Sequence, residues 1–178
     1  MKYSILAILF TISCGGVPPL TADGGEQRLS PSVSPVHYSV RLELDPNRTE
    51  YRGHVDVGLK VIASTPQIRL HSLEHQIRRA VLTDTKGRAV TLDIKRKGVD
   101  WLVLTGPGVI GPGRYELSIE FDGKMTNPLF GMYRTKQAGD WYIYSQFEAL
   151  GAREAFPCFD EPQFKTPYAM TLIVPEGV

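Results

Sequence analysis

Apolar and polar residues alternate along most of the chain after residue 36. This period of two predicts strands that have one buried face and one solvent-facing face. The run at 101–104 is continuously apolar, which is typical of a strand covered on both faces. The predicted strands cover 38–45, 51–61, 68–70, 90–94, 101–104, 115–121, 141–147 and 169–174.

Turn-forming residues separate these strands. Asp122-Gly123 has the composition of a turn, and the glycine- and proline-rich stretch 106–113 is expected to end the preceding strand. Segment 73–81 fits two descriptions, a helix capped by Ser72 or a strand with an irregularity. At least seven short strands without a long helical pattern predict an all-β fold, an antiparallel β-sandwich.

Composition narrows the class of protein further. The chain has 178 residues, which fits one domain or at most two. A hydrophobic content of 42% with 22% charged residues is ordinary for a globular protein and argues against a disordered or fibrous one. The formal net charge of +1 lacks the basic excess of a nucleic-acid-binding surface, so no nucleic-acid partner is expected.

The first residues are typical of an export signal. One lysine, a short apolar run and small residues before Cys14 resemble a bacterial lipoprotein signal over residues 1–14, and an ordinary signal peptide cleaved after Ala22 is the alternative. The sequence predicts a flexible tether over residues 15–28 and the β domain over residues 29–178. The expected location is therefore the bacterial cell envelope, through a lipid anchor at Cys14, or the periplasm or medium. With Cys14 lipidated or removed, Cys158 has no partner for an internal disulfide.

His71, Glu74 and His75 have the spacing of the inverted zinc-protease motif H-x-x-E-H. That chemistry needs both histidines on one face of a helix. Because His71 directly follows a predicted strand, the two histidines cannot share a helical face. We therefore expect two exposed or half-buried histidines and no metal site.

The most informative stretch is 144–165. In a strand from Trp141, a period of two places Gln146 and Glu148 on one face, about 7 Å apart. A carboxylate beside an amide is suited to bind a small ammonium group, although a solvent-facing strand carries such residues without any function as well. The oppositely charged residues of the loop that follows predict an ion-pair cluster that ties this loop down. They are Arg153, Asp160, Glu161 and Lys165.

This stretch resembles the M1 family of zinc metalloaminopeptidases, the group of aminopeptidase N. The family pattern Q-F-E-x-x-x-A-R-x-x-F-P-C-F-D-E-P-x-F-K is matched at every named position from Gln146 to Lys165. Shorter likenesses, such as Gly113-x-Tyr115-x-Leu117, extend the resemblance from about Leu29 to the end of the chain.

The resemblance implies a saddle-shaped β-sandwich that packs on a thermolysin-like catalytic domain. In such enzymes Glu148 would bind the free α-ammonium group of a peptide substrate, and Gln146 would line the pocket for its first side chain. The cofactor implied is zinc in the full-length enzyme, whose activity is the release of N-terminal residues from peptides.

The family's further motifs G-A-M-E-N and H-E-x-x-H do not occur in this sequence. We therefore assign no catalytic residue and no metal ligand to it. We expect a truncated N-terminal domain that lacks its catalytic partner domain and is inactive alone. The alternative is a stand-alone β-sandwich lipoprotein that acts as a binding or interaction module.

Overall fold

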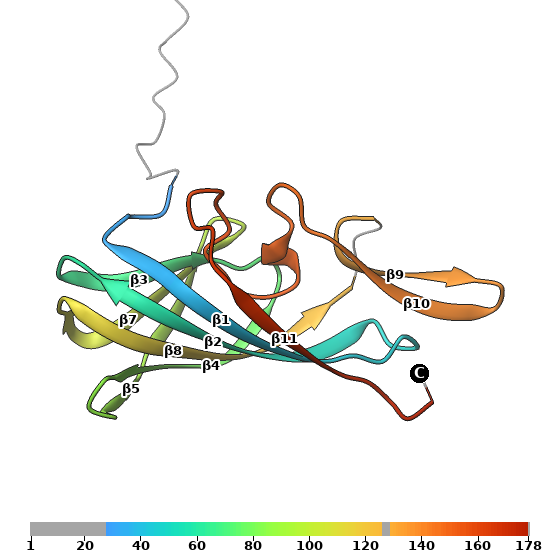
Figure 1. Cartoon of the computed structure of the whole chain (residues 1–178), viewed down its shortest axis with the longest axis horizontal. Helices are drawn as coiled ribbons and strands as arrows, with labels where there is room; N and C mark the ends of the chain where they lie inside the picture. The colour runs from blue at the N-terminus through green and yellow to red at the C-terminus, as the bar shows by residue number, and fades with distance from the viewer. Residues whose placement is uncertain (1–27, 126–128, 178) are drawn as a thin grey trace, which may run out of the picture.

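The structure is a computed structural model that describes residues 28–125 and 129–177. In that part of the chain, eleven strands and one short 3-10 helix succeed one another (Figure 1). They are β1 (Val33–Glu43), β2 (Glu50–Val61), β3 (Thr65–His71), β4 (Gln76–Asp84), β5 (Ala89–Thr91), β6 (Asp93–Lys97), β7 (Trp101–Ile110), β8 (Gly113–Lys124), β9 (Gly131–Gln137), β10 (Asp140–Gln146), η1 (Ala152–Glu154) and β11 (Tyr168–Ile173).

The strands form two sheets and a separate hairpin. The larger sheet has the order β11-β1-β2-β8-β4-β5, the smaller one has the order β3-β7-β6, and β9 pairs only with β10. The predicted all-β sandwich is confirmed, and its strand pairs are antiparallel with one exception. β11 runs parallel to β1 at the edge of the larger sheet, with Tyr38 opposite Tyr168 and Leu42 opposite Leu172.

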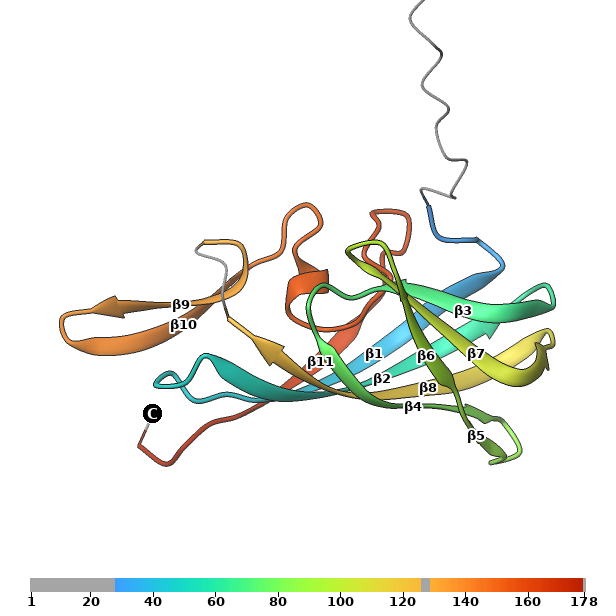
Figure 2. The ribbon, with the colours of Figure 1, turned by 180° about the vertical axis from the view of Figure 1, so that it is seen from behind.

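The core lies on one face of the larger sheet. The smaller sheet covers one part of this face, and the segment between β10 and β11 covers another (Figures 1 and 2). Alternate residues of the central strands point into this core, as the period of two predicts. Those that are almost fully buried include Val40, Leu42, Val55, Val57, Leu117 and Ile119 from the larger sheet, and Ile68, Leu70, Leu102 and Leu104 from the smaller one.

Leu92 forms a corner between the two sheets. β5 pairs with β4 in the larger sheet, whereas β6 pairs with β7 in the smaller one. Only Leu92 separates β5 from β6, and its side chain is buried while its N–H donates to Ala80 O (2.9 Å). The chain thus changes sheets at one apolar residue that remains in the core.

Of segment 73–81, which also fitted a helix, residues 76–81 belong to strand β4 (Gln76–Asp84), and residues 73–75 precede it. The strand interpretation with an irregularity is correct, because the register against β8 shifts between Ile77 and Arg79. Ser72 is therefore not a helix cap. It is fully buried, and its hydroxyl lies 3.0 Å from Nδ1 of His75.

Two predicted interruptions of the strands were wrong. Gly123 lies inside β8 opposite Tyr51, and a Cβ on Gly123 would lie 2.2 Å from the Tyr51 ring, so the glycine makes room for an aromatic side chain. β7 also continues past Gly106 to Ile110. The register against β3 shifts there, so the glycine- and proline-rich stretch forms an irregularity within the strand. β9 was not predicted.

Three predictions for the N-terminal part fall on residues that the structure leaves out. The export signal 1–14, the lipidation site Cys14 and the tether 15–28, apart from Arg28, lie outside the described residues and stay predictions. Within residues 28–125 and 129–177, no helix combines the length and the apolar character needed to cross a membrane.

Both histidines of the H-x-x-E-H spacing are buried, so the expectation that they are exposed or half-buried was wrong. His71 ends β3 and its ring lies 4.6 Å from that of Trp101. Tyr51 gives its hydroxyl proton to Ala155 O (2.8 Å), so its oxygen accepts from Nε2 of His75 (3.2 Å). Ser72 then donates to Nδ1, which keeps His75 neutral. Burial, and next the positive charge of Arg96, lower the pKa of His75 to about 3.

We predict that the free energy of unfolding falls as the pH drops below 6.5. In the unfolded chain His75 gains a proton near pH 6.5, whereas in the folded chain it stays neutral until about pH 3. This difference lowers the stability by about 2 kcal/mol between pH 7 and pH 5. His71, whose pKa is lowered by burial and by Arg153, acts in the same direction.

Urea unfolding of the chain and of the variant His75→Gln at the two pH values measures this effect. In His75→Gln the free energy of unfolding should lose most of its dependence on pH. Tyr51→Phe should lower the free energy of unfolding at both pH values but leave its dependence on pH in place. An unchanged slope in His75→Gln would contradict the prediction.

Candidate functional site

The hairpin of β9 and β10 extends away from the two packed sheets (Figure 1). Its two faces differ in composition. One face carries tyrosines: Tyr133 lies directly opposite Tyr144, their rings stack at 5.8 Å, and Tyr142 follows on the same face. Gln146 is the last residue of β10 and lies on this face too, opposite Gly131.

The other face of the hairpin carries the indole ring of Trp141. The guanidinium of Arg134 lies 3.8 Å above this ring, and the ammonium group of Lys136 lies 6.0 Å from its centre. Arg134 also donates to Pro46 O (2.9 Å) in the loop between β1 and β2. Both cations of this face therefore point away from Gln146, and Arg134 ties the hairpin to the larger sheet.

Glu148 follows β10 by two residues and its side chain is exposed. Its N–H donates to the side-chain oxygen Oε1 of Gln146 (3.0 Å), so the two residues are in direct contact. Tyr142, Tyr144, Gln146 and Glu148 are all exposed, whereas Ile143 is half-buried. The alternation expected from the sequence therefore holds as far as Tyr144 and is lost at Ser145, which is exposed too, and Glu148 itself lies just beyond the strand.

The segment that follows Glu148 is fixed to the core by backbone hydrogen bonds. His71 and Cys158 form an isolated antiparallel bridge, in which each N–H donates to the other's carbonyl (2.8 and 2.9 Å). The N–H of Leu73 donates to Arg153 O (2.8 Å). The segment thereby pairs with the end of β3 through backbone hydrogen bonds, as a neighbouring strand would.

Aromatic side chains hold the same segment from the side of the larger sheet. The hydroxyl of Tyr38 accepts from the N–H of Phe159 (3.0 Å), and Phe156 packs edge-on against Tyr38 and Phe147. Burial raises the pKa of Tyr38 far above its usual range, so this hydroxyl stays neutral. Phe147, the residue between Gln146 and Glu148, is in this way packed against the core.

Arg153 joins two loops through its guanidinium. Nε donates to a carboxylate oxygen of Asp160 (2.9 Å), a second nitrogen donates to Asp160 O (2.8 Å), and the third pairs with Asp100 in the loop between β6 and β7. The side chains of Arg153 and Asp160 are only 12% and 10% exposed. Burial lowers the pKa of Arg153, but the two carboxylates outweigh burial and raise it, so the charge is retained.

The expected ion-pair cluster is thus confirmed for Arg153 and Asp160 only. Glu161 and Lys165 lie outside it, and Glu161 instead accepts from the N–H of Leu29 (2.6 Å). Asp100 was missed, because nothing in the local sequence links it to a residue 53 positions away.

Cys158 is a free cysteine in the middle of this segment. It is fully buried, and burial raises the pKa of its thiol well above the usual range. A thiol that does not ionise is a poor nucleophile. Cys158 therefore acts in packing.

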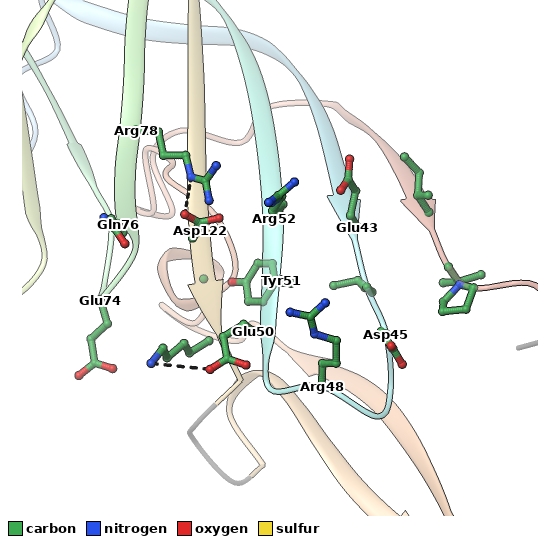
Figure 3. Close-up of a pocket in the computed structure, with 16 residues that line it drawn as sticks. Glu43, Asp45, Arg48, Glu50, Tyr51, Arg52, Glu74, Gln76, Arg78 and Asp122 are labelled. Carbon is green, nitrogen blue, oxygen red and sulfur yellow. Dashed lines mark hydrogen bonds and ion pairs between the residues drawn. The ribbon is translucent and has the colours of Figure 1, made fainter.

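A cavity of about 650 Å³ lies elsewhere, at the end of the larger sheet near the loop between β1 and β2 (Figure 3). Charged side chains of both signs line it. Arg78 pairs with Asp122, and Lys124 lies 3.9 Å from Glu50. Neither Gln146 nor Glu148 contributes to it. With its charges largely matched, this cavity is not a candidate for the ammonium site.

Among the described residues, no group of three or more histidine, cysteine, aspartate or glutamate side chains is placed to hold a metal ion. His71 and His75, the pair with zinc-protease spacing, are both engaged within the core. These residues therefore do not fit a zinc ion.

Comparisons with known proteins identify the family to which this domain belongs. Residues 34–178 match the family model described as the peptidase M1 N-terminal domain. The chain therefore belongs to the M1 peptidase family.

Individual relatives agree with this assignment. A glutamyl aminopeptidase of Bos taurus is 32% identical over 173 residues, which cover 89% of this chain and 18% of the relative. A glutamyl aminopeptidase of Sus scrofa is 30% identical over 176 residues, 90% of this chain and 19% of the relative. A puromycin-sensitive aminopeptidase of Caenorhabditis elegans is 30% identical over 158 residues, 83% of this chain and 16% of the relative. The chain thus spans less than a fifth of the length of these relatives.

We predict that Arg153→Met lowers the free energy of unfolding by about 3–5 kcal/mol, because it leaves the carboxylate of Asp160 buried without its partner. Urea unfolding at pH 7 measures the loss. Arg79→Met is the matched control, since Arg79 pairs with Glu120 at 3.8 Å on the exposed face of the sheet. That pair should contribute at most about 1 kcal/mol. Equal losses in the two variants would contradict the prediction.

Proposed function

We propose that this chain is the domain of a zinc-dependent aminopeptidase that recognises the N-terminus of its peptide substrate. In this proposal Glu148 binds the free α-ammonium group, and Gln146 lines the pocket for the first side chain. The observation that carries the proposal is the exposed pair Gln146–Glu148 at the end of β10, within a segment that matches the family pattern throughout.

The chemistry of the pair supports this role. An ammonium group has three donors and needs acceptors, and charge-assisted hydrogen bonds to a carboxylate are stronger than neutral ones. The amide oxygen of Gln146 already accepts from the backbone N–H of Glu148, which fixes the side chain of Gln146 against the backbone of Glu148. Fixing the amine in this way would present only the first peptide bond to the catalytic groups.

The catalytic step itself is assigned to a part of the protein outside this chain. The described residues do not fit a zinc ion, and none of them is assigned to the chemical step. What this chain contributes is binding and orientation. We further propose that the protein is exported and held at the envelope by the N-terminal segment, or released into the periplasm or medium.

We predict that Glu148→Gln in the complete aminopeptidase lowers kcat/KM by about two orders of magnitude. Losing a charge-assisted contact of up to about 3 kcal/mol corresponds to a factor of roughly 100. Steady-state kinetics with aminoacyl reporters measure the effect. Glu43→Gln, which removes another exposed carboxylate, in β1, is the control and should leave kcat/KM unchanged. Unchanged kinetics in Glu148→Gln would disprove the ammonium site.

The chain of 178 residues by itself should release no amino acid from an aminoacyl reporter, with or without added zinc. The reason is that its described residues supply neither a metal site nor a group assigned to the chemical step. Purified chain incubated with the reporter, with zinc and with a chelator, tests this. Hydrolysis that the chelator abolishes would refute the proposal that this chain only binds the substrate and the catalytic step takes place elsewhere.

A further inference from the structure

We infer that Tyr144, backed by Tyr133, extends the pocket for the substrate's first side chain and favours long apolar or aromatic residues there. This inference rests on the proposed function, because it takes Gln146 and Glu148 as the start of the pocket. It adds to Gln146 a second residue of β10 that determines which first side chain of the substrate is preferred.

The argument begins with the spacing along β10. Tyr144 and Gln146 are alternate residues, so they share a face and lie about 7 Å apart. A substrate whose amine is bound at Glu148 and whose first side chain runs past Gln146 meets Tyr144 next. Only a long side chain reaches that far, and alanine does not.

The tyrosines of the hairpin supply a binding surface at this point. Gln146 lies opposite Gly131, and the side chain of Glu154 fills the space beside this glycine. Tyr144 lies opposite Tyr133, and their stacked rings, inclined by only 20°, form one apolar surface on the other side of Gln146. Tyr144 is 43% exposed, so part of its surface is free to contact a ligand.

The chemistry of this face indicates which side chains fit. Aromatic rings offer apolar area and stack with other rings. The π-face is electron-rich and disfavours a carboxylate. The cations of the hairpin, Arg134 and Lys136, lie with Trp141 on the opposite face. An acidic first side chain would thus find no positive partner on the hairpin, and a phenylalanine or methionine side chain would find a matching surface.

The test is the variant Tyr144→Ser in the complete aminopeptidase, assayed with reporters that carry phenylalanine, methionine or alanine. We expect kcat/KM to fall about tenfold for phenylalanine and methionine and to stay unchanged for alanine, as for the loss of one apolar contact in a pocket. Tyr144→Phe keeps the ring and should retain the preference. Tyr142→Ser is the matched control, because Tyr142 is 44% exposed on the same face but one alternation farther from Gln146.

Three results would overturn the inference. They are equal losses for all three reporters in Tyr144→Ser, no loss for any, and the same selective loss in Tyr142→Ser. Thermal unfolding of each variant checks that the fold is kept, and the ratio of phenylalanine to alanine activity is independent of the amount of folded enzyme. The proposed function is tested separately: it fails if Glu148→Gln leaves kcat/KM unchanged for every reporter.

Discussion

The guanidinium of Arg153 bonds to two carboxylates from different loops in a place that is almost closed to solvent. Asp160 belongs to the segment that follows the hairpin, and Asp100 belongs to the turn between β6 and β7. A buried charge is costly unless its hydrogen-bonding groups are satisfied, and here all three guanidinium nitrogens have partners. The same residue offers its carbonyl to Leu73, at the exit of β3. The small sheet and the segment after Glu148 are thereby held in one arrangement.

This arrangement is what gives an exposed glutamate a defined position. Glu148 is outside any strand, but the chain before it is paired with β9 and the chain after it is fastened through the bridge of His71 and Cys158. Phe147 packs against Phe156, which is itself in the core. The ordering of this segment is thus supplied by burial and hydrogen bonds elsewhere in the domain, so binding need not supply it.

Sequence reasoning identified what is local or periodic. The alternation along β1, β2 and β8 revealed their buried faces, and the contiguous pattern from Gln146 to Lys165 revealed the family. It failed where the reason for a residue lies far away in the chain. Gly123 resembles a turn residue, but it is glycine because the ring of Tyr51 occupies the space of its side chain. His75 was expected to be exposed or half-buried, but it is a buried hydrogen-bonding partner of Tyr51 and Ser72. Asp100 carries no local signal for its pairing with Arg153.

The candidate site is held from two sides that share contacts. The position of Glu148 depends on the segment held by Arg153, and so on the core. The positions of Gln146 and Tyr144 depend on the hairpin, which reaches the larger sheet through the bond from Arg134 to Pro46 and the core through Met132. The hairpin also packs against η1, where the side chain of Glu154 fills the space beside Gly131. On the proposed function, amine binding and side-chain preference are therefore coupled, because a change at the Arg153 cluster that displaces η1 also displaces the hairpin that carries Gln146 and Tyr144.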